Sequence, residues 1–186
     1  METHIITPKK KTLDDIIIGG IYRIHRKKPL NEVNIQEETE PVKIEQFDDI
    51  EEQRMYIFVL RKLSPIDKGI QGLHAAVEYG VKFSQDKEYR RWSQQDKTVI
   101  MLDCGDCKDM EYNMNRISSE FGWKIVTFEE PDLNNLLTAF AVLVPKSVWG
   151  ADTISLTMDC IQNGMTDKYR YISEAHSFLN EFHLAR

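Results

Sequence analysis

An uninterrupted apolar run, Met55-Tyr56-Ile57-Phe58-Val59-Leu60, constrains the fold more than any other segment. A run of this length without a polar residue is typical of a strand that is covered on both faces. It therefore predicts a central strand in a sheet that carries helices on either side. With 186 residues, the chain is long enough to bury such a core without disulfide bonds or a metal.

A helix is expected directly after this strand. Ser64 can accept hydrogen bonds from the free amides of a first helical turn, and Pro65 suits the first helical position. The negative charge of Asp67 would then stabilise the N-terminus of the helix, which is the positive end of its dipole. The helix is therefore predicted to begin between Ser64 and Lys68.

Two stripes of side chains run along this predicted helix. Large apolar residues recur at steps of three and four, which places them on one face that we expect to pack on the sheet as core: Ile66, Ile70, Leu73, Val77 and Val81. Polar residues form a second stripe about a quarter of a turn away, at the edge of the buried face: Asp67, Gln71, His74 and Glu78. A cleft is expected along this polar stripe.

The next segments alternate between strand and helix patterns. We predict strands at Thr98–Leu102, Lys124–Phe128 and Leu137–Val144, and a helix at about Lys108–Phe121 that is closed by Gly122. The resulting order is β-α-β-α-β-β. It predicts an α/β fold, a three-layer α/β/α sandwich with a mixed, mostly parallel sheet of four to five strands.

This domain is expected to span residues 54–149, with an extension at each end. Residues 1–53 contain alternating segments and an acidic stretch, which predict either short β-strands or a loosely attached acidic arm. Residues 150–186 are predicted to form a C-terminal extension with a helix near Ser173–Phe182, whereas the type of Ile154–Ile161 is left open.

The composition of the chain limits the cellular compartment and the kinds of partner that we expect. The longest uncharged stretch, Leu133–Pro145, is too short to cross a bilayer, and Met1–Lys11 lacks the features of a secretory signal. Three cysteines do not indicate a disulfide framework. We therefore expect a cytoplasmic protein with reduced thiols and no membrane partner. A net charge of −6 disfavours unspecific coating of nucleic acid, and DNA is not expected as a partner.

Polar residues gather in one connection between two apolar strands, Glu129 to Thr138. In an open α/β sheet, ligand sites collect at the carboxyl ends of strands. Polar groups in such a connection must face solvent, a ligand or each other. This connection is therefore the strongest candidate for a site.

Two motifs, in this order, resemble the type II peptidyl-tRNA hydrolases. Gln71-Gly72-Leu73-His74-Ala75-Ala76 after an apolar strand is similar to the family's Gln-x-x-His-Ala signature. Phe128-Glu129-Glu130-Pro131-Asp132-Leu133-Asn134-Asn135, followed by Leu137-Thr138-Ala139-Phe140-Ala141, is similar to a shortened segment of bacterial relatives. The likeness covers Met55 to about Val144. It implies a three-layer α/β fold that cleaves the ester between a peptide and the 3′ ribose of tRNA, with no metal or organic cofactor.

The resemblance implies catalytic positions at Gln71, His74, Asp132 and Thr138. Ester hydrolysis needs a positioned water, a base with a pKa near neutrality and donors for the oxyanion. His74 would be the base, oriented by Asp132, or Asp132 would position the water directly. Gln71 and Thr138 would donate hydrogen bonds. The partner would be tRNA or another nucleotide-containing ligand, held by a set of cationic and amide side chains: Lys68, Arg90, Arg91, Asn134 and Asn135.

One position departs from the family pattern. The family usually has a lysine four residues before the glutamine, and this chain has Asp67 there, with Lys68 next to it. A shift by one residue rotates a side chain by roughly 100° around a helix. A non-catalytic module that binds a nucleotide, RNA or protein is therefore the alternative function.

Two further features allow more than one interpretation. Cys104-Gly105-Asp106-Cys107 lies between a strand and a helix, and inert thiols, a thiol oxidoreductase or half of a metal site all stay open. Arg90-Arg91-Trp92 could clamp an RNA end by phosphate pairing and stacking, or form an ordinary amphipathic surface. A homodimer is also left open.

Overall fold

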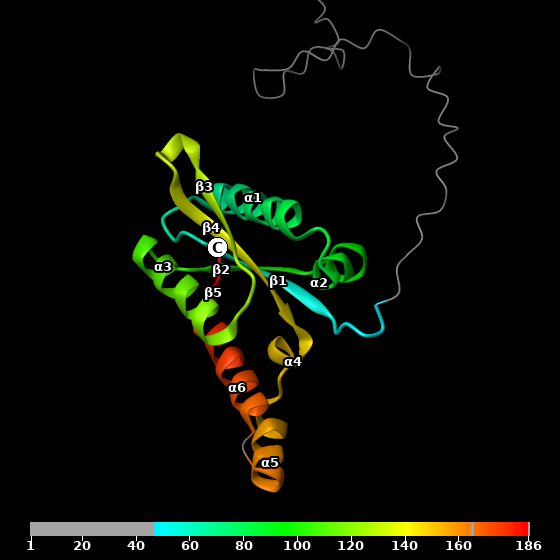
Figure 1. Ribbon diagram of the computed structural model, residues 1–186. Coiled ribbons are helices and arrows are strands. Elements are labelled where there is room, and N and C mark those ends of the chain that lie inside the picture. The colour runs from blue at the N-terminus through cyan, green and yellow to red at the C-terminus, as the bar shows by residue number, and fades with distance from the viewer. Residues whose placement is uncertain (1–46, 165, 186) are drawn as a thin grey trace, which may run out of the picture. The chain divides into compact units, whose positions relative to one another are not determined.

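The computed structural model describes residues 47–164 and 166–185 (Figure 1). The β element or acidic arm that the sequence predicts lies, for residues 1–46, outside the described part. The strands are β1 (Gln53–Val59), β2 (Val99–Asp103), β3 (Val126–Glu130), β4 (Leu136–Pro145) and β5 (His183–Leu184). The α-helices are α1 (Pro65–Phe83), α2 (Lys87–Arg91), α3 (Cys107–Arg116), α4 (Lys146–Trp149), α5 (Thr153–Asn163) and α6 (Asp167–Asn180). Short helical turns follow α2 (η3, Trp92–Asp96), α3 (η4, Ile117–Phe121) and β3 (η5, Pro131–Leu133).

The described strands form one mixed sheet in the order β3-β4-β1-β2-β5. The predicted α/β class is confirmed, and so is the parallel pairing of β1 with β2 across α1. The expectation of a mostly parallel sheet is wrong, because the other three pairings are antiparallel. The reason is that β4 turns back from β3 and inserts between β3 and β1. Two neighbouring pairs thereby become antiparallel, although β1, β2 and β3 run in the same direction.

The apolar run Met55–Leu60, most of which lies in β1, is covered on both faces, as its sequence predicts. Met55, Ile57 and Val59 belong to one core, together with Ala75 and Tyr79 of α1. The alternate residues Tyr56, Phe58 and Leu60 belong to a second core, which includes buried residues of α3, η4 and α6: Met110, Ile117, Phe121, Ala175, Phe178 and Leu179. Helices thus pack on both sides of β1 (Figure 1).

Helix α1 begins as predicted, but it turns a different face to the sheet. The side chain of Ser64 accepts from the Asp67 amide, which confirms the predicted start. The apolar stripe that was expected in the core instead faces solvent: Ile66, Ile70, Leu73, Val77 and Val81. The opposite face is buried and carries small and polar residues: Lys68, Gln71, Gly72, Ala75 and Tyr79.

Close packing explains this orientation of α1. A Cβ atom on Gly72 would stand 2.6 Å from the Cε of Met101 and 3.4 Å from a methyl of Ile57. The helix backbone therefore lies almost directly on the strands, at a distance that only small side chains such as those of Gly72 and Ala75 allow. Helical periodicity identifies an apolar face, but it does not reveal that a small face can lie closer to a sheet.

The C-terminal residues 150–186 contribute to the fold through α6 and β5. Ala175, Phe178 and Leu179 of α6 lie in the core with Phe58, and β5 pairs with the end of β2. Helix α5 covers the segment whose type the sequence leaves open. None of the helices formed by residues 47–164 and 166–185 combines the length and the apolar character needed to cross a membrane.

Candidate functional site

Buried polar side chains gather where α1 starts over the sheet. In the described part of the chain, the buried polar or charged residues are Gln53, Lys68, Gln71, Asn113 and Thr138. Three of them, Lys68, Gln71 and Thr138, lie beside the carboxyl end of β1, because α1 follows β1 and the Leu60 amide donates to the Thr138 carbonyl. Burying polar groups costs free energy unless they are hydrogen-bonded. Their gathering at one sheet edge therefore marks the first place to look for function.

A β-bulge directs Thr138 toward this edge. Phe128 of β3 pairs with Ala139 of β4, whereas the next residue, Glu129, pairs with Leu137. Thr138 is therefore the extra residue of β4. Without the bulge, strand alternation would place Thr138 and Ala139 on opposite faces of the sheet. A bulge re-aims a side chain in this way and is over-represented next to active sites.

A chain of hydrogen bonds leads from Thr138 to a carboxylate. The Thr138 hydroxyl donates to Oε1 of Gln71 over 2.8 Å, and Nε2 of Gln71 donates to Oε2 of Glu130 over 2.6 Å. The Phe128 carbonyl lies farther from the Thr138 hydroxyl, at 3.3 Å. Because a hydroxyl has one proton, the shorter contact to Gln71 sets the direction. The amide of Gln71 is thereby fixed, and it holds the carboxylate of Glu130 in place.

Glu130 is held at both carboxylate oxygens. Its Oε1 accepts from the Asp132 backbone amide at 3.4 Å, which caps η5, while Oε2 accepts from Gln71. The side chain is half-buried, so one side of the carboxylate reaches solvent. Glu130 is not among the site residues predicted from the sequence, whereas Asp132 is. The signal was present, because strand alternation puts Glu130 on the same face of β3 as Phe128 and Val126.

Lys68 occupies the next buried position, one turn before Gln71. Its ammonium lies 3.4 Å from the carboxylate of Asp103, and Arg61 pairs with the same carboxylate at 3.1 Å. Burial alone would raise the pKa of Asp103, but hydrogen bonds from the Gly105 amide and Arg61, with the charge of Lys68, hold that pKa below its usual value. Lys68 therefore presents a buried cation that is paired with Asp103 on the sheet side of α1.

Asp67, which stands where the family usually has a lysine, faces solvent at the start of α1. Its carboxylate accepts from the hydroxyl of the N-cap residue Ser64 at 2.6 Å, so it supports the helix cap rather than facing the sheet. The cation on the sheet side of α1 is Lys68.

Among the described residues, no hydrogen bond links the side chains of His74 and Asp132 to Gln71 or Thr138. The His74 ring is exposed and stacks on Phe128, with 4.5 Å between centroids and 13° between planes. Asp132 is exposed in η5, on the connection between β3 and β4. Within residues 47–164 and 166–185, no hydrogen bond joins the side chains of His74 and Asp132. Proximity therefore gives no support to a base at His74 oriented by Asp132.

Asn134 and Asn135 shape the turn between β3 and β4. Both adopt left-handed backbone angles, with φ of 55° and 57°, which asparagine tolerates better than most residues. The Asn135 amide donates to the Glu130 carbonyl at 3.0 Å. Both side chains are exposed, so the structure gives them a turn-forming role beside Glu130.

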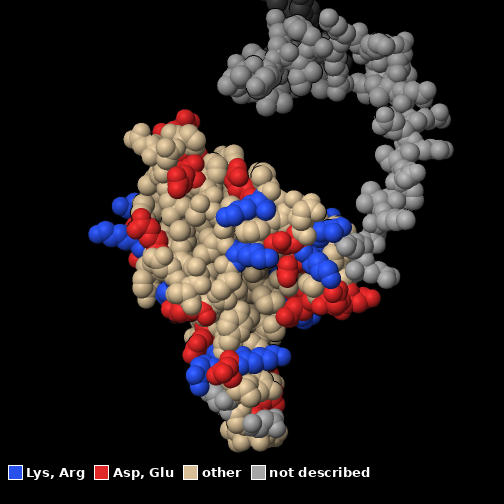
Figure 2. All heavy atoms as spheres, viewed as in Figure 1, with Lys and Arg blue, Asp and Glu red and all other residues tan. Residues whose placement is uncertain are grey.

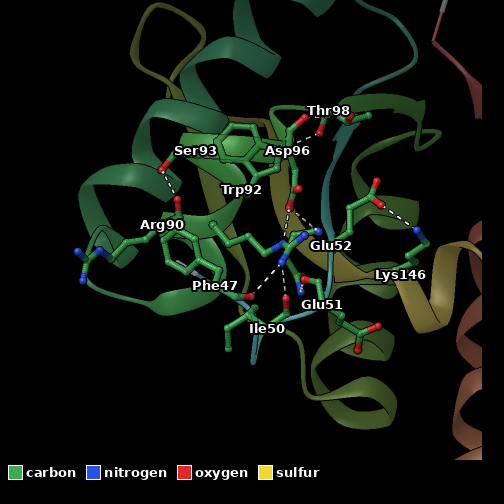
Figure 3. A network of polar contacts seen from close by, with 12 residues as sticks. Phe47, Ile50, Glu51, Glu52, Arg90, Trp92, Ser93, Asp96, Thr98 and Lys146 are labelled. Carbon is green, nitrogen blue, oxygen red and sulfur yellow. Dashed lines mark hydrogen bonds and ion pairs between the residues drawn. The ribbon is translucent and has the colours of Figure 1, made fainter. Parts of the chain in front are cut away.

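Arg90 and Arg91 lie at the opposite end of β1 from Thr138. Arg91 pairs with Asp96 at 3.1 Å and donates to the carbonyls of Phe47 and Ile50, while Asp96 also accepts from the Gln53 amide at the start of β1. The guanidinium of Arg91 therefore ties the segment before β1 to η3. Figure 3 shows this network, with the side chain of Arg90 pointing away from it. Neither arginine is placed beside Gln71.

The face of the molecule drawn in Figure 2 carries no broad basic area. There, the Lys and Arg side chains of the described residues are interspersed with Asp and Glu. This agrees with the net charge of −6. On this face, contact with a nucleic acid would have to be local rather than extended.

Of the two cysteines near β2, Cys104 is poorly suited to thiol chemistry. Cys104 is buried, and burial raises the pKa of its thiol to about 12, although a hydrogen bond from Asn113 at 3.6 Å opposes this shift. A protonated thiol is a weak nucleophile. Cys104 and Cys107 are both free. The described residues contain no group of three or more His, Cys, Asp or Glu side chains placed to hold a metal ion.

Two cavities of the described part lie away from the Glu130 carboxylate. One, of about 420 Å³, is lined by residues of β2, α3 and the C-terminal end, among them Asp103, Tyr112 and His183. The other, of about 350 Å³, lies near the start of β1 and includes Trp123. Gln71, Glu130 and Thr138 line neither of them.

Comparison with known proteins leaves the family open. No model of a protein family matches the chain, and no curated protein matches its sequence.

Proposed function

We propose that the domain is a peptidyl-tRNA hydrolase-like esterase whose centre is formed by Lys68, Gln71, Glu130 and Thr138. The observation that carries the proposal is the fixed carboxylate of Glu130, held through Gln71 by the buried hydroxyl of Thr138. Two supports come from the sequence: the resemblance of the two motifs, and the occurrence of Gln71 and Thr138 in both the motifs and the hydrogen-bond chain. Helices on both sides of β1 agree with the three-layer arrangement that the resemblance implies.

Glu130 would act as the general base. Its carboxylate would accept a proton from a water molecule that attacks the ester carbonyl, a role that typically contributes about 10²- to 10⁴-fold to a rate. Gln71 and Thr138 would keep the carboxylate oriented, and Lys68 would offset the negative charge that develops on the carbonyl oxygen. Asp132 would contribute its backbone amide rather than its carboxylate.

The half-buried position of Glu130 suits the end of a large substrate, because the carboxylate can be reached from outside the domain. Most of a tRNA would remain outside the domain, and only the ester at its 3′ end would have to reach Glu130. Such a substrate would be met in the cytoplasm, which is where we propose the protein acts.

The proposal is tested by release of peptide from peptidyl-tRNA, measured with the full chain under single-turnover conditions. We expect release that depends on enzyme concentration and stops when Lys68 is replaced by methionine, which removes the charge and keeps much of the length. Spontaneous hydrolysis of the same tRNA provides the baseline. A wild-type rate equal to that baseline would refute the esterase.

A non-catalytic binding module is the second candidate. The stacking of His74 on Phe128 and the exposure of the Asp132 side chain favour it, because among the described residues neither side chain forms a hydrogen bond with the buried cluster. This candidate predicts a higher melting temperature in the presence of peptidyl-tRNA or its 3′-terminal nucleoside, without turnover. Detection of product would exclude it.

A further inference from the structure

The outer face of α1 presents a continuous apolar stripe to solvent. Its five members expose between 46% and 76% of their surface: Ile66, Ile70, Leu73, Val77 and Val81. Single exposed apolar residues are common on protein surfaces, but a contiguous row marks an interaction site. The row follows one side of a helix of 19 residues. This surface, which we name the α1 stripe, is not used by the proposed esterase site.

The spacing of the α1 stripe identifies the geometry of its partner. Steps of four and three residues are those of the seam between two packed helices. A narrow row of this kind fits one helix lying along α1. A helix of similar length with a matching row of apolar side chains would cover the whole α1 stripe.

The α1 stripe is complementary to itself. About the midpoint between Leu73 and His74, Ile66 is as far in one direction as Val81 is in the other. Ile70 and Val77 are likewise equally far from that midpoint. When two copies of α1 lie antiparallel about a two-fold axis at this midpoint, Ile66 meets Val81 and Ile70 meets Val77 of the other copy, while Leu73 lies beside the axis, next to Leu73 of the other copy. Such a symmetric contact uses the same patch on both copies.

Two further properties support the antiparallel arrangement. The dipoles of the two α1 helices then point in opposite directions and attract each other, whereas the dipoles of a parallel pair would repel. Gly69 borders the α1 stripe, and nothing lies within 4 Å of the point where its Cβ would stand. A neighbouring helix can therefore approach closely at Gly69, since the distance between packed helices depends on the side chains at the contact.

We infer that the protein forms a homodimer through antiparallel packing of the α1 stripes of two copies. Ten large side chains, five from each copy, would bury on the order of 1,000 Å² of apolar surface. This area lies near the lower limit of specific interfaces, so we expect a dissociation constant in the micromolar range. The inference does not depend on ester hydrolysis.

Analytical ultracentrifugation of the full chain tests the dimer. We expect the sedimentation coefficient to rise from that of a monomer to that of a dimer between roughly 1 µM and roughly 100 µM, a range that brackets the expected affinity. Leu73→Glu should remain monomeric throughout, because it places a charge beside the axis. Its circular dichroism and melting temperature should match the wild type, since Leu73 is exposed. A wild-type chain that stays monomeric overturns the inference.

Ile154→Glu provides the matched control. Ile154 is also a large apolar residue exposed on a helix, α5, with 74% of its surface accessible. This variant should dimerise like the wild type. Loss of the dimer in Ile154→Glu but not in Leu73→Glu would assign the interface to α5 and overturn the role of α1.

Cross-linking tests the antiparallel register. In a background with Cys107→Ser and Cys160→Ser, chains with Ile66→Cys are mixed with chains with Val81→Cys and oxidised. We expect disulfide-linked heterodimers in the mixture and little cross-linking of either variant alone, because a disulfide needs Cα atoms within about 7 Å. Efficient self-cross-linking of both single variants would indicate a parallel pair and contradict the antiparallel arrangement.

Discussion

A Glu130→Gln variant is expected to hydrolyse peptidyl-tRNA about 10²- to 10⁴-fold more slowly than the wild type, which is the usual contribution of a general base. Glutamine retains the shape of the side chain, and its one carbonyl oxygen can still accept from Gln71 while the longer hydrogen bond from the Asp132 amide is lost, so the fold should persist. What it removes is the ability to accept a proton from water. The measurement is the single-turnover rate of peptide release, with the melting temperature recorded for each variant.

Asp132→Asn is the matched control for this prediction. Asp132 lies two residues from Glu130 in the same connection and loses the same charge, but its side chain is exposed. Its backbone amide, which donates to Glu130, is unaffected by the substitution. We expect the rate of Asp132→Asn to stay within a few-fold of the wild type. A rate as low as that of Glu130→Gln would return the catalytic role to Asp132.

Phe58→Ala is expected to lower the free energy of unfolding by about 3–5 kcal/mol, the usual range for a large aromatic residue removed from a core. Phe58 is fully buried in β1 and stacks on Phe140 of β4, with 4.6 Å between ring centroids. Its ring also lies 5.0 Å from Phe182 and 6.2 Å from Phe178. Its loss would leave a cavity where β1, β4 and the C-terminal segment meet.

Urea unfolding followed by tryptophan fluorescence measures this effect. Tyr112→Ala serves as the control, because Tyr112 is an exposed aromatic residue on α3, and surface substitutions usually change stability by no more than about 0.5 kcal/mol. A Phe58→Ala variant as stable as Tyr112→Ala would mean that residues 167–184 do not pack on the sheet as described.

The central strand and the helix start could be predicted from the sequence because both depend on local signals. The run from Met55 to Leu60 has no polar residue, and the Ser64-Pro65 pair is a strong N-terminal signal for a helix. The direction of β4 could not be predicted in the same way. Its position between β1 and β3 depends on long-range pairing, which periodicity does not encode.

The exposed face of α1 was mistaken for its buried face for a physical reason. Apolar periodicity assumes that the larger apolar residues are the buried ones. Here Gly72 and Ala75 allow the helix to lie close to the sheet, and the large residues remain outside, where a partner can cover them. The mismatch between pattern and burial is therefore itself information about an interface.

The candidate site was predicted in part. Gln71 and Thr138 were identified from the motifs, and the structure joins them by a hydrogen bond. Glu130 was missed although strand alternation places it on the same face of β3 as Phe128 and Val126, because the two motifs direct attention to Asp132. The bulge that directs Thr138 toward Gln71 leaves only a weak trace in the sequence.

The most direct test of the proposed site is a crystal structure of the protein soaked with a non-hydrolysable aminoacyl-adenosine analogue, which represents the 3′ end of the substrate. The proposal predicts density for the ester mimic beside the carboxylate of Glu130 and the amide of Gln71. Density confined to the cavity at Tyr112 and His183, or to the one at Trp123, would contradict it.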